Sequence, residues 1–104
     1  MKYGIATDEF DQMLNVFRRH KDIRRVALFG SRALRTHRLG SDIDLAIVGT
    51  DLAFAELLDV VSELDELNTL YSFDVVDVAR LTNQALLDHI HRVGISIYAT
   101  DEAS

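Results

Sequence analysis

Two aspartates separated by one residue, Asp42 and Asp44, are the strongest chemical signal in this sequence. They begin the apolar stretch 42–48, DIDLAIV, which predicts a β-strand. In a strand both side chains point to one face, about 7 Å apart. Like charges repel unless something neutralises them, and carboxylate oxygens are the ligands that Mg²⁺ prefers. The pair therefore predicts a metal site, with an edge strand that has a polar outer face as the alternative.

A glycine and a serine, Gly30 and Ser31, follow the strand expected over 24–29, RRVALF, and open a short helix expected over 31–36. Glycine permits a tight turn and a close approach of the backbone to a ligand. Amides at such a turn bind phosphate, and Ser31 adds a hydroxyl donor. We expect a phosphate site here, and the alternative is an ordinary turn with Ser31 as the helix N-cap.

A third acid, Asp74, lies in the stretch 72–78, SFDVVDV, which also predicts a strand. Alternation places Asp74 on one face with Val76, and Asp77 on the other with Phe73. A carboxylate between apolar residues is costly to bury unless it is paired or bound to metal. If this strand lies beside that of Asp42, three carboxylates can surround two metal ions. We expect Asp77 to be solvated near the strand end, although a swap of the two roles stays open.

Basic side chains between Ser31 and Asp42 are candidates to offset phosphate charge. We expect Arg32 to contact a nucleotide, together with Ser41 in the polar loop 37–41. Arg35 and Arg38 are expected at the surface. The histidines have no metal-ligand spacing beyond the adjacent pair on the last helix, and all four are expected to face solvent or a partner: His20, His37, His89 and His91.

Changes in hydrophobic period divide the chain into alternating helices and strands. Helices are expected over 7–20, 31–36, 51–67 and 82–92, the last with Thr82 as its cap and Gly94 at its end. Strands are expected over 24–29, 42–48, 72–78 and 95–99. This order predicts an α/β or α+β fold around one mixed sheet. The 104 residues fit one domain, which we place at 1–104.

The charge is unevenly distributed. The net charge of −6 argues against general nucleic-acid binding, but eight of the eleven Lys and Arg lie between Arg18 and Arg38. The cluster indicates either solvated helix faces or a local site for an anion such as a nucleoside triphosphate. The absence of cysteine excludes disulfides and thiolate metal sites. No apolar run reaches membrane-spanning length and the N-terminus carries acids, so we expect a cytoplasmic protein.

These motifs together resemble a known family. Gly30-Ser31, ten residues, Asp42-x-Asp44 and a later Asp74 are similar to the signature of the DNA polymerase beta-type nucleotidyltransferase superfamily. The text FGSRALRTHRLGSDIDLAI and the closing RVGISIYA resemble its minimal branch, the MNT proteins. The resemblance implies a small mixed sheet with helices packed on one face. It also implies that Asp42 and Asp44 hold Mg²⁺ on a triphosphate and that Asp74 completes a second metal site and takes a proton, while Gly30 and Ser31 hold the outgoing phosphates.

The resemblance also implies a partner. MNT proteins are commonly paired with HEPN-domain ribonuclease toxins and act as antitoxins by adding AMP from ATP to a toxin tyrosine. We therefore expect a protein adenylyltransferase, with a HEPN toxin as its partner. A non-catalytic module that blocks such a partner by contact is the first alternative. A small-molecule nucleotidyltransferase is the second, although little chain follows Asp74 to form a substrate domain. The nucleotide base, the acceptor and the oligomeric state stay open.

Overall fold

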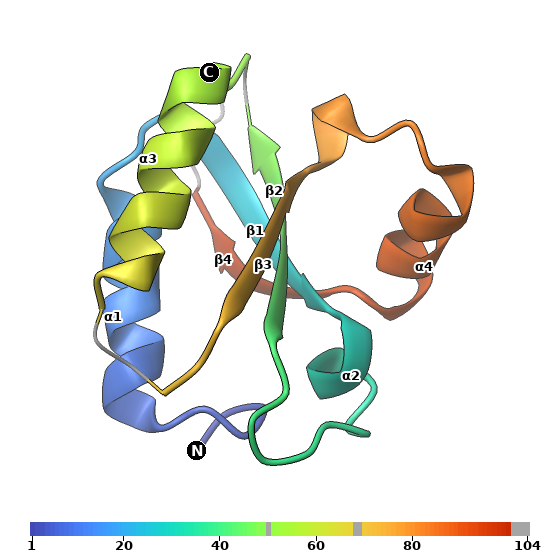
Figure 1. Cartoon of the computed structure of the whole chain (residues 1–104). Helices are drawn as coiled ribbons and strands as arrows, with labels where there is room; N and C mark the ends of the chain where they lie inside the picture. The colour runs from blue at the N-terminus through green and yellow to red at the C-terminus, as the bar shows by residue number, and fades with distance from the viewer. Residues whose placement is uncertain (50, 68–69, 101–104) are drawn as a thin grey trace.

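A four-stranded mixed sheet forms the centre of the computed structural model, which describes residues 1–49, 51–67 and 70–100 (Figure 1). Its strands are β1 (Ile23–Phe29), β2 (Ile43–Gly49), β3 (Phe73–Asp77) and β4 (Ile95–Ala99). They lie in the order β3-β2-β1-β4. Strand β1 pairs antiparallel with β2 and with β4, whereas β2 and β3 run parallel. Parallel neighbours need a crossover, and α3 (Phe54–Asp65) supplies it.

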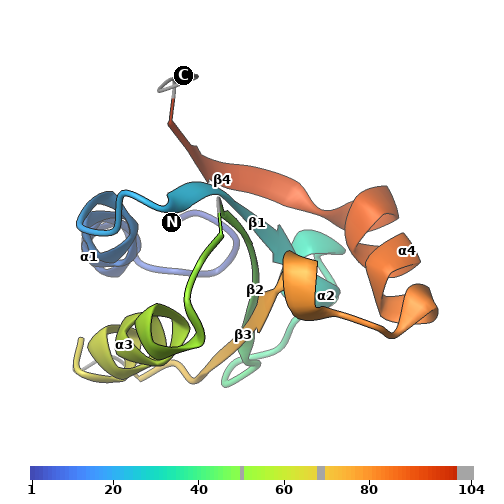
Figure 2. The ribbon, with the colours of Figure 1, turned by 90° about the horizontal axis from the view of Figure 1, so that it is seen from above.

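Helices cover both faces of this sheet (Figure 2). Helices α1 (Thr7–Arg18) and α3 lie side by side on one face, and α4 (Gln84–Val93) lies on the other. A single turn, α2 (Gly30–Ala33), follows β1, and a 3₁₀ turn, η1 (Val78–Arg80), follows β3. The expected class, α/β to α+β around one mixed sheet, is confirmed. The expectation of helices on one face describes α1 and α3, but α4 packs on the opposite face.

Strand alternation explains why both faces carry helices. Ile43, Leu45 and Ile47 of β2 are fully buried in the larger core beneath α1 and α3. The opposite face holds a smaller cluster in which Phe29 and Ala46 pack against Ile90 of α4. Because β2 is buried on both faces where these clusters meet it, the strand reads as a nearly continuous apolar run.

Local signals set the ends of α4, although not all as expected. Asn83, rather than Thr82, is the N-cap, and its side-chain oxygen accepts a hydrogen bond of 3.1 Å from Leu86 N. Gly94 follows the helix as expected, and its N–H donates to Ile90 O. A methyl group at Gly94 would collide with that same carbonyl, so the helix closes best on glycine here. Among the described residues, no helix is long and apolar enough to cross a membrane.

Candidate active site

The expected site residues meet at one edge of the sheet, at the bottom of Figure 1, where β1 ends and β2 and β3 begin. In the strand register Phe29 lies opposite Asp44, and Asp44 lies opposite Asp74. Neighbouring strands are about 4.8 Å apart, so Asp44 and Asp74 lie side by side. Phe73 and Val75 pack toward the larger core, and Val76 toward the smaller one, which is the strand phase expected from alternation.

The three aspartates interact through their charges. Burial raises the pKa of Asp44 above its ordinary value, and the negative charges of Asp74 and Asp42 raise it further. The neighbouring His89 and Arg32 act in the opposite direction and are outweighed. Asp44 is half-buried, while Asp42 and Asp74 are exposed. The edge therefore presents an excess of negative charge that a bound cation would relieve.

Gly30 lies in direct contact with this group. Its φ of +72° is left-handed, a conformation that glycine adopts without strain. A Cβ atom placed on Gly30 would collide with the carboxylate of Asp44. Glycine is therefore required twice at this position, once for the backbone conformation and once for the space that Asp44 occupies.

His89 contacts the candidate site, whereas the sequence analysis expected it to face solvent or a partner. Gly30 N–H donates to His89 Nε2 at 3.3 Å, and the His89 ring meets Phe29 edge-on with centroids 6.0 Å apart. A sequence signal existed, because His89 lies three residues after Leu86 and four before Val93, on the apolar side of the α4 pattern. The periodicity of the sequence does not show that α4 packs against α2, and this packing brings His89 to Gly30.

Arg32 lies in the wall of the site and is 1% exposed. Its Nη1 donates to Tyr3 O at 2.9 Å, its Nη2 donates to Ser41 O at 2.8 Å, and its guanidinium lies over the Tyr71 ring at 5.1 Å. The Ser41 hydroxyl accepts from Arg38 N at 2.8 Å and so fixes the turn before Asp42. The expected contacts of Arg32 and Ser41 with a nucleotide stay predictions. In this structure both residues hold the loop that carries Asp42.

Asp77 is buried rather than solvated, so that expectation is wrong. Only 5% of it is exposed, and it faces away from the Asp44 side. Its Oδ1 accepts from Ala79 N at 3.1 Å, and its Oδ2 lies 3.2 Å from Arg80 Nε. The carboxylate caps the 3₁₀ turn and pairs with a neighbouring arginine, and these partners offset the cost of burial.

The other histidines differ from one another. His20 lies between two carboxylates, with Nδ1 3.0 Å from Glu56 and Nε2 2.6 Å from Glu63, and it joins the end of α1 to α3. His37 is half-buried beside Gly4, and His91 is exposed. The expectation of a surface position therefore holds for His91 and is wrong for His20, which is a structural residue in this fold.

The donor set at the sheet edge fits Mg²⁺. Among residues 1–49, 51–67 and 70–100, no three acidic or histidine side chains form a ready-made metal cage. Mg²⁺ usually takes one or two carboxylates from a protein and completes its shell with water and phosphate oxygens. Oxygen donors with crowded negative charge, as at Asp42, Asp44 and Asp74, suit such an open site.

A mixed sheet that brings a Gly-Ser turn beside three aspartates is the arrangement of a nucleotidyltransferase domain. The model of the family described as "Polymerase beta, Nucleotidyltransferase" matches residues 11–103. The chain belongs to this family, as its motifs predicted. Among curated proteins, none matches the chain.

Solved structures share the fold. A toxin–antitoxin complex with AMP-PNP contains a chain with a TM-score of 0.72 and 22% identity, over 88% of this chain and 74% of that one. The structure of the MntA–HepT toxin–antitoxin contains a chain with a TM-score of 0.66 and 19% identity, over 91% of this chain and 74% of that one. A third structure holds a tri-AMPylated HEPN toxin from Shewanella oneidensis in complex with an MNT antitoxin. It contains a chain with a TM-score of 0.66 and 20% identity, over 88% of this chain and 71% of that one. At these identities the likeness establishes the fold.

Proposed function

We propose that this chain transfers AMP from ATP to a hydroxyl of a partner protein. The observation that carries the proposal is the register that sets Asp44 beside Asp74, with Asp42 and Gly30 at the same edge. The crowded charge at Asp44 supports a site that binds a cation with a polyphosphate. Family membership supports nucleotidyl transfer as the chemistry.

Each residue has a defined task in this proposal. The turn at Gly30 and Ser31 holds the β- and γ-phosphates through backbone N–H groups and the Ser31 hydroxyl. The Gly30 N–H now bonded to His89 is one of these donors, so His89 gives it up when phosphate binds. Asp42, Asp44 and Asp74 would hold Mg²⁺, which supplies positive charge to the triphosphate.

The transfer itself is an in-line displacement. The acceptor oxygen forms a bond to the α-phosphorus, and the bond from that phosphorus to the bridging oxygen breaks, so pyrophosphate leaves. The acceptor proton passes to Asp74, directly or through water. Because Asp74 is exposed, a hydroxyl presented on another folded surface can reach it.

We infer that the acceptor is a tyrosine of a HEPN-type toxin, which makes the chain an antitoxin of the cytoplasm. Support comes from the similar folds found in toxin–antitoxin complexes, one with AMP-PNP and one with a tri-AMPylated toxin. An added AMP places a bulky anion on the toxin, which hinders RNA by charge and volume. A module that blocks the toxin by contact is the second candidate, and it needs none of the three aspartates.

Intact mass of the partner separates these two candidates. The chain is co-expressed with the HEPN-type protein that the proposal places in the neighbouring gene, as wild type and as Asp42→Ala. Wild type should add one or more AMP masses to the partner and relieve growth arrest, whereas Asp42→Ala should do neither. If Asp42→Ala relieves growth arrest fully with no added mass, transfer is not the function and the contact-blocking module is.

A further inference from the structure

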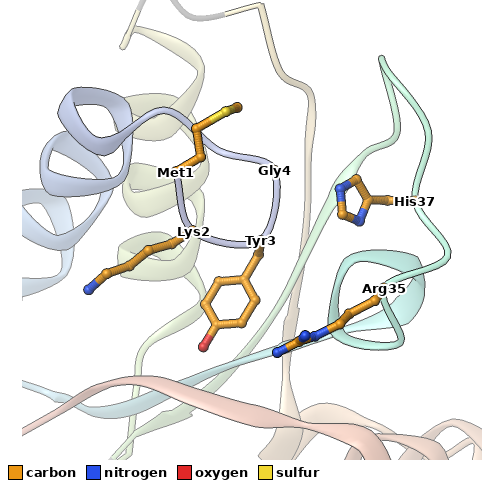
Figure 3. Close-up of a pocket in the computed structure, with 6 residues that line it drawn as sticks. All are labelled: Met1, Lys2, Tyr3, Gly4, Arg35 and His37. Carbon is orange, nitrogen blue, oxygen red and sulfur yellow. The ribbon is translucent and has the colours of Figure 1, made fainter.

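A basic pocket lies beside the site, between the N-terminal turn and the loop after α2 (Figure 3). Its volume is about 530 Å³, and its lining is Met1, Lys2, Tyr3, Gly4, Arg35 and His37. None of the three aspartates lines it. A neighbouring pocket of about 310 Å³ shares Gly4 and His37 and adds Arg38. Ligand pockets commonly span about 300–1,000 Å³, so this space suits a molecule of nucleotide size.

The lining is cationic in an acidic protein. Lys2, Arg35 and Arg38 contribute positive charge, and neither pocket contains an Asp or Glu. Within the described part of the chain, no ion pair involves these three side chains, but the Lys2 ammonium lies over the Phe10 ring at 5.4 Å. An anion entering the pocket would therefore meet the positive charge of Arg35 and Arg38.

One polar atom at the pocket lacks a partner. His37 Nδ1 is buried and has no hydrogen-bond partner among the described residues. An anion bound by the Arg35 guanidinium would accept from this imidazole N–H as well. The left-handed φ of Arg35, +61°, has a local cause, because Arg35 N donates to Arg32 O and Thr36 N donates to Ser31 O where α2 ends.

The pocket wall is connected to the site through hydrogen bonds. The turn closes through Lys2 N to Ile5 O at 3.0 Å and Ile5 N to Lys2 O at 2.8 Å. Arg32 ties this turn to the loop before Asp42, because it donates to both Tyr3 O and Ser41 O. A ligand that orders the turn would therefore also order the backbone that carries Asp42.

We propose that this pocket binds a phosphate ester of nucleotide size, separately from the ATP at the aspartates. Arg35 and His37 recognise the phosphate, and the Tyr3 ring offers a surface on which a base can stack. In Figure 3 the Tyr3 and Arg35 side chains extend into the same region, and the His37 ring faces Gly4 across the gap. The inference does not depend on AMP transfer.

Binding of AMP without divalent metal tests the proposal. The ¹⁵N-labelled chain is titrated with AMP in EDTA, and with adenosine as the ligand that lacks phosphate. Amide shifts are expected at Tyr3, Gly4 and His37, with a smaller response at Asp42, and adenosine should bind much more weakly. Shifts confined to Gly30 and Asp44, or equal binding of adenosine, would overturn the proposal.

Two variants and one control make this test specific. Arg35→Gly removes the charge and relieves the left-handed strain, so it should fold well and still weaken AMP by about ten-fold, the worth of one charge-assisted hydrogen bond. His37→Gln should weaken binding through the second phosphate-binding side chain. Lys21→Gln removes one positive charge three residues beyond α1, a helix about 18 Å long whose other end follows the N-terminal turn, and should leave binding unchanged. AMP affinity unaffected by both Arg35→Gly and His37→Gln would also overturn the proposal.

Discussion

Gly30 approaches Asp44 so closely that one methyl group would displace the carboxylate. We expect Gly30→Ala to lose Mg²⁺-dependent ATP binding and about 1–2 kcal/mol of unfolding free energy, since alanine is strained at this positive φ. Urea unfolding and calorimetric titration measure the two effects. Gly40→Ala is the matched control, because Gly40 has a φ of +87° but nothing within 4 Å of its Cβ position. Gly40→Ala should lose stability but keep ATP binding. An equal loss of ATP binding in the two variants would show that the close approach of Gly30 to Asp44 is not what nucleotide binding requires.

Arg32 has a structural task besides the nucleotide contact that the sequence predicts for it. In the structure its guanidinium donates to two backbone carbonyls. We expect Arg32→Met to cost about 2–3 kcal/mol, because both carbonyls lose a donor while they stay partly buried. Denaturant unfolding measures this, with exposed Arg38→Met as the control. Full stability of Arg32→Met combined with lost ATP binding would instead make Arg32 a direct nucleotide ligand.

At the scale of the elements, strand alternation in β3 separates folding from chemistry. Phe73 packs against the larger core, and Asp74 faces the site. We expect Phe73→Ala to destabilise the fold by roughly 3 kcal/mol, the low end for a phenylalanine because Phe73 is half-buried. Asp74→Ala should leave stability nearly unchanged and abolish transfer. Thermal unfolding and the partner-mass assay measure the two outcomes, and the reverse pattern would contradict the strand phase.

His20, which joins the end of α1 to Glu56 and Glu63 of α3, makes the stability of the fold depend on pH. Burial by itself lowers the pKa of His20, but hydrogen bonds to Glu56 and Glu63 and their charges outweigh it, so the pKa is raised above 6.5. The folded state then binds this proton more tightly than the unfolded state. The stability that this proton contributes is complete below the unfolded-state pKa of about 6.5. It is lost as the pH rises through the folded-state pKa of His20.

Melting temperatures between pH 6 and pH 9 test this contribution of His20. The wild-type melting temperature should fall across the range, and His20→Gln should reduce the slope because the titrating partner of Glu56 and Glu63 is gone. His91→Gln, an exposed change on α4, should keep the wild-type slope. An unchanged slope in His20→Gln would show that other groups carry the pH dependence.

How far the sequence predicts this molecule depends on the range of the interaction. Alternation placed Asp42 and Asp44 on one face of a strand and Asp74 on the face opposite to Phe73, because period two is a local property. The register that joins Asp44 to Asp74 needs a parallel pairing across a whole helix, which local patterns do not specify. The contact of His89 with Gly30 was not predicted for the same reason, because it depends on how α4 packs.

Asp77 differs from the expectation for a simpler reason. A carboxylate near a strand end reads as solvated, but Arg80 three residues later supplies a cation and the following turn supplies an N–H. The spacing of these residues is visible in the sequence. The burial of the pair is not, because it depends on how the 3₁₀ turn folds back toward Leu52, whose carbonyl accepts from Arg80 Nη2 at 3.1 Å.

At the scale of the whole molecule, the three aspartates are proposed to act as one nucleotide site. They lie at one open edge of the small sheet, with the basic pocket next to it and helices on both faces of the sheet. An open edge suits an acceptor that arrives on another protein. The proposed acceptor therefore depends on nucleotide binding by the aspartates.

Calorimetric titration of ATP, with and without Mg²⁺, tests whether the aspartates bind the nucleotide. Wild type should bind ATP only when Mg²⁺ is present, and the double variant Asp42→Asn with Asp44→Asn should bind at least about ten-fold more weakly, since two charged ligand groups are lost. The double variant Asp59→Asn with Asp65→Asn removes two exposed charges on α3 and should bind as wild type does. If the Asp42 and Asp44 variant binds Mg-ATP as tightly as wild type, the aspartates are not the nucleotide site and the proposed AMP transfer at them is wrong.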